Sequence, residues 1–258
     1  MKSWHHTMSG GFISLVIFMG LLLCWELSAY YDFSSIVFFP SPSTIILNTY
    51  QGLFEGELAH STIVTVTRIG IGTFIGGILG LLVGLVMGLF SRIRSIIDPF
   101  VSALHPIPKI ALLPVAIIFF GIGGATKIVI IAFSAFFPIC IDTMYGVRQL
   151  NSVYFDVAKN YKKSQLILIR DIVLPGSLPS IITGARIALN SSFLVTISVE
   201  IIMGPDGLGS VIWRSWETFN MANFYSALLV IVILGTTSNA ILEAINKQKL
   251  KWVFYEQV

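Results

Sequence analysis

Unbroken apolar blocks are the feature that most constrains how this chain can fold. Several runs of roughly 20 residues carry almost no charge, and a helix of that length crosses a hydrocarbon core about 30 Å thick. Charged residues make up only 11% of the 258 positions, against about a quarter in soluble domains. The strands of a β-barrel would give short alternating patterns instead. We therefore expect an all-α integral membrane protein.

About six transmembrane helices are predicted, and together they form one membrane domain over residues 1–258. Their approximate ranges are 11–30, 61–90, 99–120, 128–145, 181–203 and 225–244. A helix from about residue 42 to 54 is too short and polar to span, so we expect it along the membrane surface. With this arrangement most cationic residues outside the spans fall on one side, and the positive-inside rule places both termini in the cytoplasm.

The third block is interrupted by prolines. Asp98 followed by Pro99 predicts an N-cap and the first turn of a helix. Three further prolines, at positions 106, 108 and 114, each remove a backbone hydrogen bond. Broken backbone at membrane depth is tolerated where it is buried in protein or lines a cavity. His105 and Lys109 lie one turn apart beside the break, and two interpretations stay open: a structural role, or contact with a passing substrate.

Five glycines recur every fourth residue in the second block. Such spacing places them on one helix face, where a neighbouring backbone can approach closely. These residues are Gly72, Gly76, Gly80, Gly84 and Gly88. Close helix packing is the favoured interpretation, and a glycine-lined permeation path is the alternative.

The fifth block carries unusually many polar side chains for a span. A polar face within a span should turn to the bundle interior or to water. At 3.6 residues per turn one face holds Arg186, Asn190, Phe193, Ile197 and Glu200. This face is our candidate for the lining of a transport pathway. Hydrogen bonds between helices would also explain why Asn190 lies within a span.

The one long polar, basic interruption runs from residue 151 to 179. Val153, Val157 and Tyr161 repeat every four residues, and Ser164 stands where a second helix would have its N-cap. We expect two short amphipathic helices over about 151–173 that contact another protein. A solvated loop whose charge only fixes membrane orientation is the alternative.

The chain shows no catalytic, metal or nucleotide-binding motif. Its histidines do not cluster with cysteines or carboxylates at metal-ligand spacing. The G-x-x-x-x-G-K-[ST] pattern that cradles phosphates does not occur either. We expect no bound cofactor, no nucleic-acid partner and no ATP hydrolysis by this chain, so any ATP-derived energy must come from a partner.

The central interruption resembles a known family. The segment DVAKNYKKSQLILIRDIVLP, from Asp156 to Pro175, resembles the cytoplasmic EAA-type signature of permease subunits of binding-protein-dependent ABC importers. The resemblance is closest to the sulfonate, taurine and nitrate group, and FPSPSTII and GPDGLGSVI extend it along the chain. It implies a type I importer, or MetI-like, permease fold whose helix pair docks into a groove on a separate ATPase subunit.

Residues that match the signature are implied to couple the permease to its ATPase. Carried over by position, they are Asp156, Val157, Ala158, Lys162, Leu174 and Pro175. Lys162 stands where the family has a glycine that allows the turn between the two helices. Val153, Tyr161 and Ser164 join this set from the apolar and capping pattern.

The resemblance also implies a function and a set of partners. It implies a permease subunit in a bacterial cytoplasmic membrane that imports a small, anionic solute of the sulfonate, taurine or nitrate type. Its partners would be a second permease copy in a homodimer, two ATPase subunits that bind ATP and magnesium, and an extracytoplasmic solute-binding protein. An ion- or proton-coupled secondary transporter or channel is the alternative, with Glu200, Arg186 or Asp142 as coupling residues.

Overall fold

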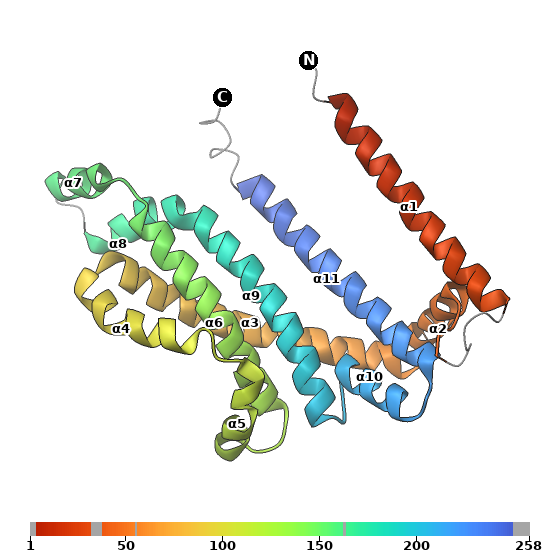
Figure 1. Ribbon diagram of the computed structural model, residues 1–258. Coiled ribbons are helices and arrows are strands. Elements are labelled where there is room, and N and C mark those ends of the chain that lie inside the picture. Colours follow the sequence, from red (N-terminus) through yellow and green to blue (C-terminus); the bar gives the residue numbers. More distant parts are fainter. Residues whose placement is uncertain (1–3, 32–37, 55, 162–163, 250–258) are drawn as a thin grey trace.

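The computed structural model describes residues 4–31, 38–54, 56–161 and 164–249, and within these ranges the chain forms helices joined by short turns, without strands (Figure 1). The α-helices are α1 (Trp4–Tyr30), α2 (Pro42–Phe54), α3 (Glu57–Leu89), α4 (Ser91–Leu104), α5 (Leu113–Phe120), α6 (Gly124–Arg148), α7 (Ser152–Asn160), α8 (Gln165–Leu168), α9 (Leu174–Met203), α10 (Leu208–Glu217) and α11 (Met221–Lys249). A 3₁₀ turn, η1 (Lys109–Leu112), precedes α5, and a π turn, η2 (Ile169–Val173), joins α8 to α9. The predicted all-α fold is confirmed.

Five helical segments in the described chain are long and apolar enough to cross a membrane. They are Phe12–Tyr30, Glu57–Leu89, Gly124–Arg148, Gln165–Met203 and Met221–Ala244. A sixth candidate consists of two pieces, Ser91–Leu104 and Lys109–Phe120, which are bent by 96° at the break between them. The prediction of about six spans is therefore confirmed, with the third span broken.

The start predicted for that third helix is wrong. α4 begins at Ser91, because the extended backbone of Phe90 separates it from α3, and both Asp98 and Pro99 lie inside the helix. Pro99 therefore costs one internal hydrogen bond instead of beginning the helix. The chain breaks further along, in the segment that contains Pro106 and Pro108, while Pro114 occupies the first turn of α5, where a proline fits.

The glycine spacing in α3 corresponds to a close contact with α6. A β-carbon on Gly80 would lie 2.5 Å from the carbonyl oxygen of Phe136, and one on Gly76 would overlap the carbonyl of Ala132. The same holds for Gly84 against Cys140, since the distance to its carbonyl oxygen would be 2.5 Å. Backbone thus packs on backbone along this face, and a larger residue has no room.

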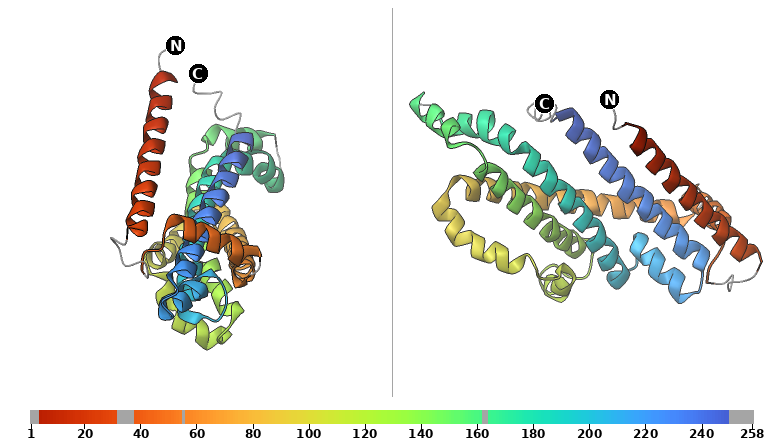
Figure 2. Two further views of the ribbon diagram at one scale, coloured as in Figure 1. Left: turned by 90° about the vertical axis from the view of Figure 1, so that its right-hand side faces the viewer. Right: turned by 45° about the horizontal axis from the view of Figure 1, so that its top comes forward.

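The three helices α3, α6 and α9 pack side by side and form the centre of the molecule (Figures 1 and 2). By contrast, α1 stands apart from them and contacts the rest near its C-terminal end. There Trp25 packs edge-on against Tyr225 of α11, and Glu26 accepts hydrogen bonds from the backbone nitrogen and hydroxyl of Ser43 in the first turn of α2.

Short helices lie at the two opposite ends of α9. At its N-terminal end are α7 and α8, and at its C-terminal end is α10 (Figure 1). The start of α1 and the end of α11 lie on the side of α7 (Figures 1 and 2).

Candidate functional site

The short helix α7 presents an apolar face that is largely exposed within the described chain. The Asn151 side chain caps the helix by accepting a hydrogen bond from the Val153 backbone nitrogen at 3.0 Å. Val153, Val157 and Tyr161 are 56%, 45% and 75% exposed. Exposed apolar side chains at this spacing are typical of a docking face. Asp156 is also exposed, whereas Ala158 is buried.

The second half of the predicted helix pair differs from expectation. Ser164 caps α8 as predicted, because its hydroxyl accepts from the Ile167 backbone nitrogen at 3.4 Å. However, α8 is not a separate coupling helix: it continues through η2 into α9 and forms one helical segment from Gln165 to Met203. Lys162, which stands where the family has the glycine that allows the turn between the two helices, lies outside the described residues.

An apolar cluster joins this region to the spans. Buried Leu85 of α3, Val147 of α6 and Val173 of η2 form its centre. Phe155 of α7 and Leu174 of α9 pack against them. The cluster therefore connects α7 and α8 to the three central helices through close contacts. Beside the cluster, exposed Pro175 lines a cavity of about 520 Å³ between α7, η2 and the start of α9.

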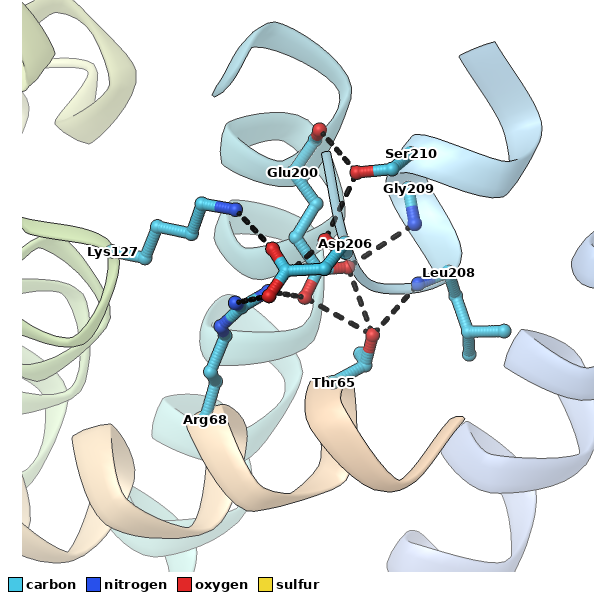
Figure 3. Close-up of polar contacts among 8 residues, drawn as sticks. All are labelled: Thr65, Arg68, Lys127, Glu200, Asp206, Leu208, Gly209 and Ser210. Atoms are coloured by element: carbon cyan, nitrogen blue, oxygen red, sulfur yellow. Dashed lines mark hydrogen bonds and ion pairs between the residues drawn. The ribbon is translucent and has the colours of Figure 1, made fainter. Parts of the chain in front are cut away.

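A buried ionic network occupies the opposite end of α9 (Figure 3). Arg68 of α3 donates from Nη1 to Oε1 of Glu200 at 2.9 Å and from Nη2 to Oδ2 of Asp206 at 2.7 Å. The Glu200 side chain is completely buried, and that of Arg68 is 10% exposed. A charge this deep is tolerated only when it is paired and hydrogen-bonded, and Thr65 supplies a further donor to Glu200 at 2.9 Å.

Asp206 connects the network to a second cation. Its Oδ1 lies 3.0 Å from Nζ of Lys127 at the start of α6, and that lysine side chain is 3% exposed. Asp206 stands in the turn between α9 and α10, outside the spans. The Arg68 hydrogen bond, together with Lys127, holds the pKa of the Asp206 carboxyl well below its usual range, at about 2. The carboxylate is therefore charged at any physiological pH.

The same groups hold the beginning of α10. The backbone nitrogen of Leu208 donates to Oγ1 of Thr65 at 2.9 Å, and that of Gly209 donates to Oε2 of Glu200 at 3.1 Å. The Ser210 hydroxyl donates to the carbonyl oxygens of Glu200 and Asp206. Two of the first-turn backbone donors of α10, which lack partners within the helix, are therefore satisfied by side chains of α3 and α9. The network thus ties α3, α6, α9 and α10 into one unit (Figure 3).

The structure separates the residues predicted to line a pathway. Glu200 faces Arg68 and has no exposed surface, so we assign it to the ionic network and correct its predicted place in a pathway. Ile197 packs in an apolar cluster around Leu208. Asn190 is exposed and accepts a hydrogen bond from Asn239 of α11 at 3.0 Å.

The other pathway candidates lie nearer to surfaces of the chain. Arg186 and Phe193 are half-buried on α9. His105 and Lys109 border the break after α4, where the Lys109 ammonium donates to the His105 carbonyl and lies 4.8 Å from the centre of the Phe137 ring. For these four residues a pathway role stays a prediction.

Sequence reasoning missed most of the network. Of its charged members only Glu200 is among the predicted site residues, whereas Arg68, Lys127 and Asp206 are not. A usable signal was present: Arg68 and Glu200 are opposite charges within two apolar spans, and such charges tend to pair. Nothing in the linear sequence, however, specifies that residues separated by 132 positions meet.

Within the described chain, no group of three or more histidine, cysteine, aspartate or glutamate side chains is placed to hold a metal ion. The two cysteines are free thiols, Cys24 exposed and Cys140 buried.

Five long apolar helical segments and one bent pair, with an exposed amphipathic helix at one end and a buried ionic network at the other, define a multi-pass membrane protein. Residues 76–251 match the family described as "Binding-protein-dependent transport system inner membrane component", and the chain belongs to that family. It is a permease subunit of an ABC importer, as the signature resemblance implied.

Relatives and a solved structure agree with this assignment. The chain is 31% identical to a protein of Escherichia coli (strain K12) assigned as the aliphatic sulfonates transport permease protein SsuC, over 91% of this chain and 89% of that one. It is 29% identical to the taurine transport system permease protein TauC of the same organism, over 90% of this chain and 86% of the relative.

Bicarbonate transport system permease protein CmpB of Synechococcus elongatus is also 29% identical, over 91% of this chain and 88% of the relative. In structure, the chain is similar to the MetNI methionine ABC transporter, with a TM-score of 0.64 and 18% identity over 74% of this chain and 95% of that one. The MetI-like permease fold is therefore confirmed.

Proposed function

We propose that two copies of this chain form the translocation pathway of an importer in a bacterial cytoplasmic membrane. Two ATPase subunits would bind ATP and magnesium and drive alternating access, and an extracytoplasmic binding protein would deliver the solute. ATP hydrolysis is assigned to the partner because the chain has no phosphate-binding motif.

The observation that carries this proposal is the uncovered face of α7. Val153, Val157 and Tyr161 project from a short helix that is rooted, through Phe155, in the cluster joining the central spans. An ATPase groove that takes this face would move α3, α6 and α9 together. The side of the membrane that bears α7 would then be the cytoplasmic side, in keeping with the positive-inside rule.

For the solute, relatives indicate a small anion. Their names include aliphatic sulfonates, taurine and bicarbonate. At the other end of the molecule, α10 is held rigidly by the ionic network and would form part of the surface that receives the binding protein.

Reconstitution tests the proposal directly. Purified permease and its ATPase, placed in liposomes with the binding protein, should accumulate solute only when ATP is present. Asp156→Lys should reduce uptake at least tenfold while the ATPase stays active, because the reversed charge lies beside the docking face. Glu243→Lys, the same charge reversal at an exposed position of α11, serves as the matched control. Uptake that follows a proton or sodium gradient without ATP would refute the proposal.

A further inference from the structure

A polar cavity of about 350 Å³ lies between α6 and α9, in the half of the spans nearest to α7. Apart from Pro179, each described residue that lines it has a side-chain oxygen, and these residues are Asp142, Tyr145, Gln149, Ser180 and Thr183. Polar faces within a span turn away from lipid and towards protein or water. The cavity shares no lining residue with the docking face of α7 or with the ionic network.

Asp142 supplies the single carboxylate among the described residues of this lining. Its Oδ2 atom is buried and has no hydrogen-bond partner. An added β-carbon on Gly184 of α9 would lie 3.2 Å from that oxygen, so the carboxylate is fixed where the two helices meet. No lysine, arginine or histidine side chain of the described residues lies within the 4.0 Å that defines an ion pair with it. An unpaired carboxylate in a span is expensive, so Asp142 needs either a proton or a cation.

The lining of the cavity favours the cation. A neutral carboxylic acid suits apolar surroundings, whereas hard cations are bound by carboxylate and amide oxygens together with water. The Thr183 hydroxyl donates to the carbonyl oxygen of Pro179 at 3.0 Å, which leaves the lone pairs of its oxygen available to a cation. The cavity volume is several times the roughly 30 Å³ that one water molecule occupies. An ion therefore fits together with part of its hydration shell.

A second cavity, of about 520 Å³, adjoins the first on the side of α7, and Gln149 lines both. It is also lined by Asp171 of η2, an exposed carboxylate that lies 3.8 Å from the Arg170 guanidinium. Among the residues that the structure describes, neither cavity is lined by a lysine, arginine or histidine. The approach to Asp142 from the side of α7 is thus lined by acidic and neutral groups, which attract cations and repel anions.

The charge of the ion follows from the single carboxylate. A monovalent cation makes the site neutral, whereas a divalent cation would leave one positive charge uncompensated within the span. We propose that this cavity binds a monovalent alkali cation, with Asp142 as its charged ligand. Oxygens of Gln149, Ser180 and Thr183 would complete the site together with water. Because Asp142 packs against Gly184, the bound ion would stabilise the contact between α6 and α9. This site depends neither on the solute nor on the proposed import function.

Thermal unfolding of the permease–ATPase complex in nanodiscs tests the site. Tm is measured in mildly alkaline buffer without ATP or magnesium, while sodium or potassium chloride replaces choline chloride at constant ionic strength. A cation that binds the folded state raises Tm along a saturable curve, and we expect a rise of at least about 3 °C. Asp142→Asn should abolish this rise without lowering Tm in choline, because it also removes the unpaired charge. Ser180→Ala should increase the half-saturating concentration several-fold.

Glu217→Gln, the same loss of charge at an exposed position of α10, is the control and should keep the full cation-dependent rise. A carboxylate with a purely structural role would give Asp142→Asn the same loss of Tm in every salt, and that result refutes the site. Equal Tm in choline and in both alkali salts, or a rise that persists in Asp142→Asn, refutes it as well. A Tm that follows pH and not the alkali cation would assign a proton to Asp142 instead. If Asp142→Asn does not fold, an unchanged half-saturating concentration in Ser180→Ala decides against the site.

Discussion

Removing the Arg68 guanidinium should destabilise the protein more than any single change at its outer surface. Arg68→Met keeps the length of the side chain but leaves Glu200, which has no exposed surface, with only the Thr65 hydroxyl and the Gly209 amide. Breaking a buried pair by removing one partner costs about 3–5 kcal/mol. At about 2–4 °C per kcal/mol for a chain of this size, we expect Tm to fall by roughly 6–20 °C.

The assay is thermal unfolding in nanodiscs, and it includes a rescue and a control. Arg68→Met combined with Glu200→Gln should regain at least half of the loss, because the neutral amide no longer needs a cation. Arg214→Met removes the ion pair with Glu57, whose side chains are 46% and 61% exposed, so it should cost only about 0–1 kcal/mol. The reasoning fails if Arg68→Met and Arg214→Met lower Tm equally, or if the double variant is less stable than Arg68→Met.

Two further predictions concern packing and pH. Gly76→Ala should lower Tm strongly, because its β-carbon would overlap the Ala132 carbonyl. Gly70→Ala is the control: a β-carbon on Gly70 would have no neighbour within 4 Å, so Tm should stay unchanged or rise. Equal effects of the two substitutions on Tm would contradict the close approach of α3 and α6. The depressed pKa of Asp206, about 2, means that its stabilising contribution is complete above its unfolded pKa of about 3.9 and is lost as pH falls towards about 2. The Tm difference between the protein and Asp206→Asn should therefore shrink between pH 4 and pH 2, and a constant difference over that range would show that the charge of Asp206 is not responsible.

The features predictable from the sequence are those set by local spacing. The apolar blocks predicted the spans, because a helix can cross the bilayer when its apolar length matches the thickness of the hydrocarbon core. The four-residue glycine repeat predicted the face of α3 against which α6 packs. The Ser164 cap was predictable for the same reason, since a cap acts within three residues.

Features that depend on distant partners could not be derived in this way. The polar face proposed for the fifth span divides between the ionic network, an apolar cluster and a contact with α11, because different neighbours cover different turns of α9. The continuity of α8 with α9 also escaped prediction, since the second amphipathic helix was expected to be a separate helix that ends at about residue 173. In the structure Pro175 falls in the first turn of regular α-helix after the π turn, where its missing N–H is tolerated.

That continuity makes the helical segment from Gln165 to Met203 a rigid connection between the two ends of the molecule. Its 39 residues correspond to about 58 Å, with α8 at one end and Glu200 near the other. Gly184, almost at its midpoint, packs closely against α6, and the ionic network joins α9 to α3, α6 and α10. Nucleotide-driven motion that tilted α8 on one side of the membrane would thus move the mount of α10 on the other side together with the three central helices.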